Sequence, residues 1–225
     1  MFAVDHAATA LLIKRRFPSV PLTPILLSVQ AMELAWVGLN YLAIEHTTTE
    51  ASVRSVADIH LAYMPFSHSV ATAVGGALLA WLILEKCVGR PLLARAIAIG
   101  IVSHLVLDLV THARDIALWP GSTLPALGLG LYDRAPMWGF ALEIVYGAVC
   151  WGVYRGSWPL LAMIVLGNLA NITFFSAGIP GPEAYFAGHP LALVTVVLVQ
   201  IVTALVLVHL LATRPPPHEA TLKRA

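Results

Sequence analysis

The feature that most constrains this chain is a series of apolar stretches about as long as a lipid bilayer is thick. A helix rises 1.5 Å per residue, so about 20 residues cross the ~30 Å hydrocarbon core. Only 11% of the 225 residues are charged and 59% are hydrophobic, whereas about a quarter are charged in soluble domains. We therefore expect an all-α, polytopic transmembrane bundle. About six spans are predicted, at residues 22–44, 69–84, 91–110, 136–154, 159–177 and 191–212.

The distribution of lysine and arginine predicts the orientation of these spans. Ten basic residues fall on the side of the N-terminus, and only Arg54, Arg114 and Arg134 fall on the other. Loops rich in Lys and Arg stay in the cytoplasm. We therefore expect both termini in the cytoplasm and the two longer loops, 45–68 and 111–135, facing outward. In a bacterium this describes an integral protein of the cytoplasmic (inner) membrane.

The sequence predicts a single folded domain. Residues 1–213 form the predicted transmembrane domain, and the polar, proline-rich residues 214–225 are expected to be a disordered cytoplasmic tail. The net charge is only +1, with no basic patch, which argues against nucleic acid as a partner. Cys87 and Cys150 are far apart in sequence and form no disulfide framework.

The third predicted span carries the most informative polar motif. His104, Asp108 and His112 follow one another at i, i+4 spacing in an apolar run, so a helix places them on one face. A single buried histidine is more often a hydrogen-bonded core residue than a ligand. Three ionisable groups in register within a membrane are expensive, and they indicate metal or proton chemistry.

Other ionisable side chains gather toward the same outer half of the membrane. His68 opens the second span, Glu33 lies near the middle of the first, and Glu143 lies about 10 Å inside the fourth. Asp58 and His60 precede His68. We expect these side chains to converge on one cavity. Individually, Glu33 and Glu143 could instead pair with polar groups of neighbouring helices, and Asp58 and His60 could be solvated loop residues.

The N-terminal segment is predicted to return into the bundle. Residues 2–13 are apolar but too short to span a bilayer. As a short re-entrant helix, the segment would place His6 about 12 Å above the basic cluster at Lys14, close to Glu33 and His104. A re-entrant segment is tolerated only where protein surrounds it.

The order of these motifs resembles that of bacterial integral-membrane proteins described as membrane-bound metal-dependent hydrolases. The similarity covers roughly residues 1–150 and is carried by these pieces: Asp5-His6-Ala7, Gln30-x-x-Glu33, Asp58-x-His60, Pro65-Phe66-Ser67-His68-Ser69, Ser103-His104-x-x-x-Asp108-x-x-x-His112, Arg114-Asp115, Gly128-Leu-Gly-Leu131 and Glu143. In that family the residue at Glu33 is usually Asp, and the early histidine usually follows Gly. A fainter similarity to zinc-dependent phospholipases C and single-strand-specific zinc nucleases implies phosphoester hydrolysis at a multinuclear zinc site.

The sequence therefore favours a membrane-embedded, metal-dependent hydrolase that acts on a lipid or lipid-linked substrate. We predict a divalent metal ion, zinc, held by four core ligands. Four further side chains would either bind the metal or support these ligands. The core is His68, His104, Asp108 and Glu143, and the further side chains are His6, Glu33, His112 and Asp58. Glu143 or Glu33 would be the catalytic base.

Two other functions use the same polar residues. A transporter or an ion or proton pathway could relay protons or a metal through the cluster. A non-catalytic membrane scaffold could use the same groups to hold its helices together. Metal binding would distinguish the first prediction from the scaffold.

Overall fold

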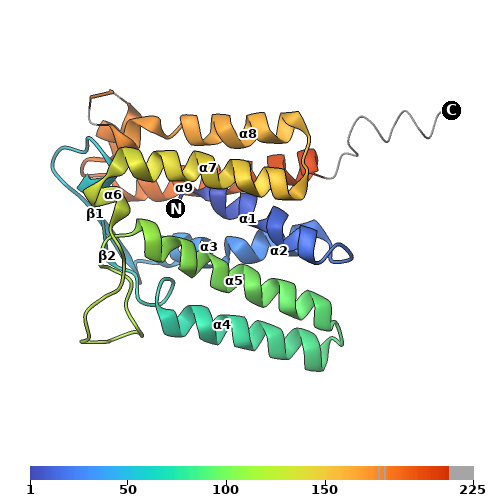
Figure 1. Cartoon of the computed structure of the whole chain (residues 1–225). Coiled ribbons are helices and arrows are strands. Elements are labelled where there is room, and N and C mark those ends of the chain that lie inside the picture. Colours follow the sequence, from blue (N-terminus) through green and yellow to red (C-terminus); the bar gives the residue numbers. More distant parts are fainter. Residues whose placement is uncertain (177, 180, 213–225) are drawn as a thin grey trace.

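The computed structural model describes residues 1–176, 178–179 and 181–212, most of them in helices (Figure 1). The α-helices of this part are α1 (Ala3–Arg16), α2 (Leu22–Val29), α3 (Ala31–Tyr41), α4 (Val70–Leu82), α5 (Pro91–Thr111), α6 (Leu131–Arg134), α7 (Pro136–Tyr154), α8 (Trp158–Leu169) and α9 (Pro190–Ala212). The shorter elements are the strands β1 (His46–Thr49) and β2 (Ile59–Tyr63), the 3-10 helices η1 (Val56–Asp58), η3 (Ile172–Phe175) and η4 (Pro182–Phe186), and the π-helix η2 (Ile83–Cys87). The predicted tail, 214–225, lies outside the described residues.

Within this part of the chain, four helices are long and apolar enough to cross a membrane. They are α4 with its η2 extension, α5, α7 and α9. A fifth span results if α2 and α3 are taken together, although the pair is bent by 54°. The prediction of a multi-pass helical bundle is therefore confirmed at this coarser level, with four to five candidate spans. The described residues do not show six spans.

The missing span is the predicted stretch 159–177. Its helix, α8, has 12 residues, which is about 18 Å and shorter than the hydrocarbon core. Near its end, the side-chain amides of Asn168 and Asn171 donate hydrogen bonds to the Ile164 and Gly167 carbonyls, at 3.2 and 2.9 Å. Asparagine competes with the backbone for such partners, and the chain continues as η3.

Helix α1 forms the centre of the bundle. Most of its side chains are buried, and α1 contacts α2, α5, α7, α8 and α9. Leu11 and Ile13 belong to a hydrophobic core with residues of the surrounding helices, and the small side chains of Ala7 and Ala8 permit close helix packing. Figure 1 shows the N-terminus among the helices. The predicted buried N-terminal helix is thus confirmed, one residue shorter at its start and three residues longer at its end.

The two longer loops meet at one end of the bundle, where β1, β2 and α6 lie (Figure 1). Strands β1 and β2 pair antiparallel, with His46 opposite Tyr63 and Thr49 opposite Ile59. This small sheet is a departure from the all-α prediction. The β-branched run Thr47–Thr49 is typical of a strand, and that signal was available in the sequence.

Candidate metal centre

A cluster of buried ionisable side chains comes from four separate elements. His104 and Asp108 lie one turn apart on α5, and His6 comes from α1. Glu33 lies in the first turn of α3, and His68 immediately precedes the N-cap of α4. Two overlapping groups have donor atoms close enough together to hold a metal ion: His6, His104 and Asp108, and Glu33, His68 and His104.

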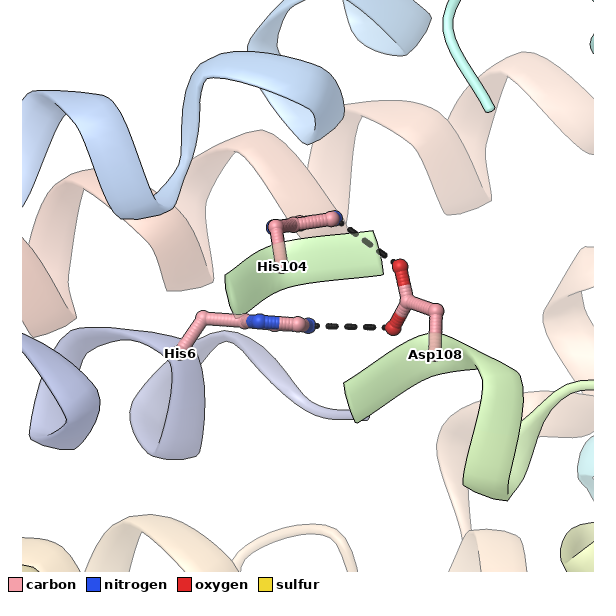
Figure 2. A group of neighbouring side chains, drawn as sticks. All are labelled: His6, His104 and Asp108. Atoms are coloured by element: carbon pink, nitrogen blue, oxygen red, sulfur yellow. Dashed lines mark ion pairs between the residues drawn. The ribbon is translucent and has the colours of Figure 1, made fainter. Parts of the chain in front are cut away.

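Asp108 connects these groups through its two oxygens. His104 Nε2 lies 3.0 Å from Asp108 Oδ2, and His6 Nε2 lies 3.2 Å from Asp108 Oδ1. Figure 2 shows both contacts, with the two imidazoles on the same side of the carboxylate. The His6 and His104 rings stack, with centroids 3.8 Å apart. The close i, i+4 pair on α5 follows the sequence prediction.

The second group lies on the Oδ2 side of the same carboxylate. Glu33 Oε2 lies 3.3 Å from His68 Nε2 and 3.5 Å from His104 Nε2. His68 Nε2 is 3.6 Å from Asp108 Oδ2. Zinc ligands lie about 2.0–2.2 Å from the metal, so neighbouring atoms of a tetrahedral set are roughly 3.3–3.6 Å apart. The separations fit this geometry.

The donor atoms of the cluster lack ordinary partners. The Nε2 atoms of His6, His68 and His104 and Oδ2 of Asp108 are buried and form no hydrogen bond within the described residues. Leaving a buried polar atom unpaired costs about 1–3 kcal/mol. These four atoms belong to the two overlapping groups that share His104, and a bound cation would satisfy them.

Hydrogen bonds behind the cluster orient two of the imidazoles. His104 Nδ1–H donates to the Val29 carbonyl at 2.8 Å. That carbonyl belongs to the last turn of α2, where carbonyls lack partners in their own helix. With Nδ1 protonated, neutral His104 directs the lone pair of Nε2 toward the cluster.

His68 is oriented by a buried chain of polar groups. The Ser67 hydroxyl donates to Glu45 Oε2 at 2.5 Å, so its oxygen accepts from His68 Nδ1–H at 2.8 Å. The other oxygen of Glu45 accepts from the backbone N–H groups of Phe66 and Ser67, both at 2.8 Å. Sequence reasoning noted Ser67 only as part of a motif and missed Glu45, because their contact spans 22 residues.

His112 lies at the edge of the cluster, just beyond α5. Its Nε2 is 3.8 Å from Asp108 Oδ1, and its Nδ1 is 3.3 Å from Asp115 Oδ1. Burial lowers the pKa of His112, but the Asp108 and Asp115 carboxylates outweigh it and the pKa is raised. The Gly130 N–H donates to the His112 carbonyl at 2.6 Å, which fixes this end of α5.

The amino group of Met1 also reaches the cluster. It donates to Asp108 Oδ1 and to Thr111 Oγ1, both at 2.8 Å. No sequence pattern indicated this contact.

Glu143 lies in a different polar group. Its Oε1 accepts hydrogen bonds from the Phe2 backbone N–H at 2.9 Å and from the Tyr132 hydroxyl. Burial and the adjacent carboxylate raise the pKa of Tyr132 well above its ordinary value, so the hydroxyl keeps its proton. Asp5 and Asn168 lie nearby, 3.4 Å apart between Oδ1 and Nδ2. The structure does not bring Glu143 into either of the two donor groups.

Asp58 is also separate from the cluster. Its Oδ2 accepts from the backbone N–H groups of Arg54 and Ser55, at 2.8 and 3.0 Å, so Asp58 closes a capping box at η1. His60 pairs with Glu50 at 2.9 Å, with both side chains about half exposed to solvent. These two residues match the alternative interpretation, in which they belong to the loop.

A cavity of about 150 Å³ adjoins the cluster. His6, Glu33, His68 and His112 contribute its polar lining. Its apolar lining includes Phe2, Trp36, Ile59, Phe174, Leu193 and Val197. Such a cavity suits a ligand with a polar group and an apolar body.

Comparisons with known protein families, with curated proteins and with solved structures find no match to this chain. The resemblance to membrane-bound metal-dependent hydrolases therefore stays a prediction. The structure itself supports a helical protein suited to a membrane, with buried His, Asp and Glu groups that could hold a metal ion.

Proposed function

We propose that this protein is a membrane-embedded, metal-dependent hydrolase that cleaves a phosphoester or related ester of a lipid or lipid-linked substrate. The observation that carries the proposal is the convergence of Glu33, His68, His104 and Asp108. Their facing atoms lie 3.0 to 3.6 Å apart in four measured pairs. Structural helix contacts would not require several unpaired nitrogen and oxygen atoms to meet in one place.

The donor set favours zinc among the common divalent ions. Imidazole nitrogen and carboxylate oxygen at tetrahedral spacing suit zinc, whereas magnesium and calcium prefer oxygen ligands. His68 and His104 each have a hydrogen bond on Nδ1 that frees Nε2 for the metal. Zinc in this site would supply Lewis acidity toward a substrate oxygen and lower the pKa of a water molecule.

Residues of the cavity can perform the remaining proton transfers. Glu33 has one oxygen in the cluster, is 21% exposed and lines the cavity, so its carboxylate is placed to accept a proton from water. His112 lines the same cavity and is held by Asp115. Its N–H can donate to the departing oxygen. Of the two predicted bases, Glu33 is favoured because Glu143 does not line the cavity.

A chelation experiment tests the proposal. Purified protein in phospholipid vesicles is assayed for release of water-soluble phosphate esters, before and after dialysis against a chelator and after addition of zinc. We expect loss of hydrolysis on dialysis and recovery with zinc. His104→Ala should be inactive, while His46→Ala, which changes an exposed histidine of β1, should keep activity. Hydrolysis that persists without metal, or a protein that never binds zinc, would contradict the proposal.

A further inference from the structure

A second space in the molecule is an apolar groove of about 610 Å³ between α8 and α9. Ala3 and Val4 of α1 and Ala204 of α9 are buried residues that line it. Leu166, Val199 and Leu207, all of them exposed, also line it. The groove therefore opens on the outer surface of the bundle, with α1 contributing to its floor.

The dimensions of the groove match one lipid chain. Along α9 it extends from Val199 to Leu211, which is about 18 Å and somewhat more than half of the ~30 Å hydrocarbon core. Helix α9 has the highest mean hydropathy of the candidate spans, 2.9. The exposed face of such a helix would meet lipid in a membrane, and water would find few hydrogen-bond partners in the groove. A lipid acyl chain is thus the occupant that its surroundings supply.

The groove adjoins the metal cavity. Ala3 and Gln200 line both spaces. At this junction Gln200 Nε2 donates to Asn171 Oδ1 at 2.9 Å, which ties α9 to the end of α8. The junction has polar groups, whereas the rest of the groove is almost entirely apolar.

A third space also adjoins the metal cavity. Ile59, Leu61 and Asp115 line both the metal cavity and a cleft of about 580 Å³. That cleft is formed by the β2 strand and the loop after α5 and includes His60 and Arg114. A cleft with charged residues in its lining, the candidate metal centre and an apolar groove are therefore neighbours, as are the polar and apolar parts of an amphiphile.

We propose that the α8–α9 groove binds one acyl chain of a membrane lipid whose ester or phosphoester group lies in the metal cavity. The position of the reacting group rests on the proposed function, whereas binding of the chain in the groove does not. The substrate class is then an acyl lipid with its polar part in the cleft beside Arg114. The gain in affinity comes from burying methylene groups, each worth a similar increment.

Photolabelling tests the groove directly. The protein is placed in phosphatidylglycerol bilayers in which one acyl chain carries a diazirine, and labelled peptides are mapped after irradiation. We expect label on α8 and α9 to exceed label on lipid-exposed α4. In Thr203→Trp, where a large side chain replaces an exposed residue of the groove, labelling of α8 should fall about tenfold, the loss expected when roughly two methylenes lose their contacts.

Val202→Trp is the matched control, because Val202 is 51% exposed on the same helix and does not line the groove. It should leave the labelling unchanged. Ala162→Trp fills the groove from α8 and gives the same comparison if Thr203→Trp does not fold. Equal labelling of α4, α8 and α9, or labelling of α8 that both groove variants retain, would overturn the proposal.

Metal analysis of the same samples separates the two proposals. Zinc-containing protein with unselective labelling would refute the groove and leave the hydrolase proposal intact. Selective labelling of α8 and α9 in a protein that binds no metal would support the groove and refute the proposed function.

Discussion

Asp108 and Glu143 are two carboxylates buried in the same bundle, 1% and 0% exposed, whose surroundings differ. Each has one hydrogen-bonded oxygen and one oxygen without a hydrogen-bond partner among the described residues. Imidazole nitrogens without hydrogen-bond partners face Asp108, whereas a backbone N–H and the hydroxyl of Tyr132 donate to Glu143. Burial of an acidic residue in a membrane helix therefore does not by itself identify a metal ligand. The atoms that face the carboxylate make the distinction.

The Glu143 group has a structural role that its neighbours explain. It joins the N-terminus of α1 to α7 and to α6 through Phe2 and Tyr132. Gly147, one turn further along α7, faces Asp5 so closely that a Cβ would lie 2.9 Å from the Asp5 carboxylate. The glycine allows α1 to enter the bundle at this depth, and α1 brings His6 to Asp108.

Substitution of the two carboxylates should differ most in its effect on zinc affinity. Asp108→Asn removes the carboxylate charge that faces His6, His68 and His104, so zinc affinity should fall by more than the ~10–100-fold that is typical of residues behind the ligands. Glu143→Gln makes the same chemical change in the other group and should keep stoichiometric zinc. Competition with a chromophoric chelator measures both. Equal zinc affinity in Asp108→Asn and wild type would exclude Asp108 as a ligand.

A smaller loss of zinc affinity is expected when the hydrogen-bond partner of His68 is removed. Ser67→Ala removes the hydrogen bond to Nδ1 and the link to Glu45, so zinc affinity should fall about 10–100-fold. Ser103→Ala is the matched control, because the Ser103 hydroxyl donates to the Gly100 carbonyl of its own helix. The same chelator competition applies. If the two variants bind zinc equally, the chain from Glu45 to His68 does not position a ligand.

In the Glu143 group we expect a substitution to lower stability and to leave zinc affinity unchanged. Tyr132→Phe removes a buried donor and should lower the free energy of unfolding by about 1–2 kcal/mol without changing zinc affinity. The thermal midpoint in detergent and the zinc titration are compared with those of wild type. Tyr63→Phe, which changes an exposed tyrosine of β2, controls for loss of a hydroxyl. Reduced zinc binding in Tyr132→Phe would place Glu143 within the metal site after all.

The comparison also explains which parts of the site the sequence predicts. His104 and Asp108 are close because both lie on one helix with i, i+4 spacing, a local property. The burial of His6 followed from an apolar segment too short to span. Glu33 reaches the cluster only because the chain bends at Gln30, between α2 and α3, and no residue pattern fixed the direction of that bend.

The failures of the sequence analysis have related causes. The depth of Glu143 was readable from its position in α7, but the neighbours it would face depend on the packing of α1, α6 and α7. The end of α8 coincides with Asn168 and Asn171, whose side-chain amides donate to carbonyls of α8. The orientation of the bundle in the membrane stays a prediction from the basic residues.

The smallest effect is expected at Asp58, which the sequence grouped with the ligands. Its carboxylate accepts from two backbone N–H groups at η1, and the pattern Ser55-x-x-Asp58 is itself that of a capping box. Asp58→Ala should lower the free energy of unfolding by about 0.5–1 kcal/mol, as loss of a helix cap does, and leave zinc affinity unchanged. Asp58→Asn keeps one acceptor oxygen and should be close to wild type in both measurements. Because the two variants differ in capping and not in charge, a stability difference between them with constant zinc affinity supports the capping role. A fall in zinc affinity in both variants would instead return Asp58 to the metal site, and would imply that the loop before His68 closes over the cavity.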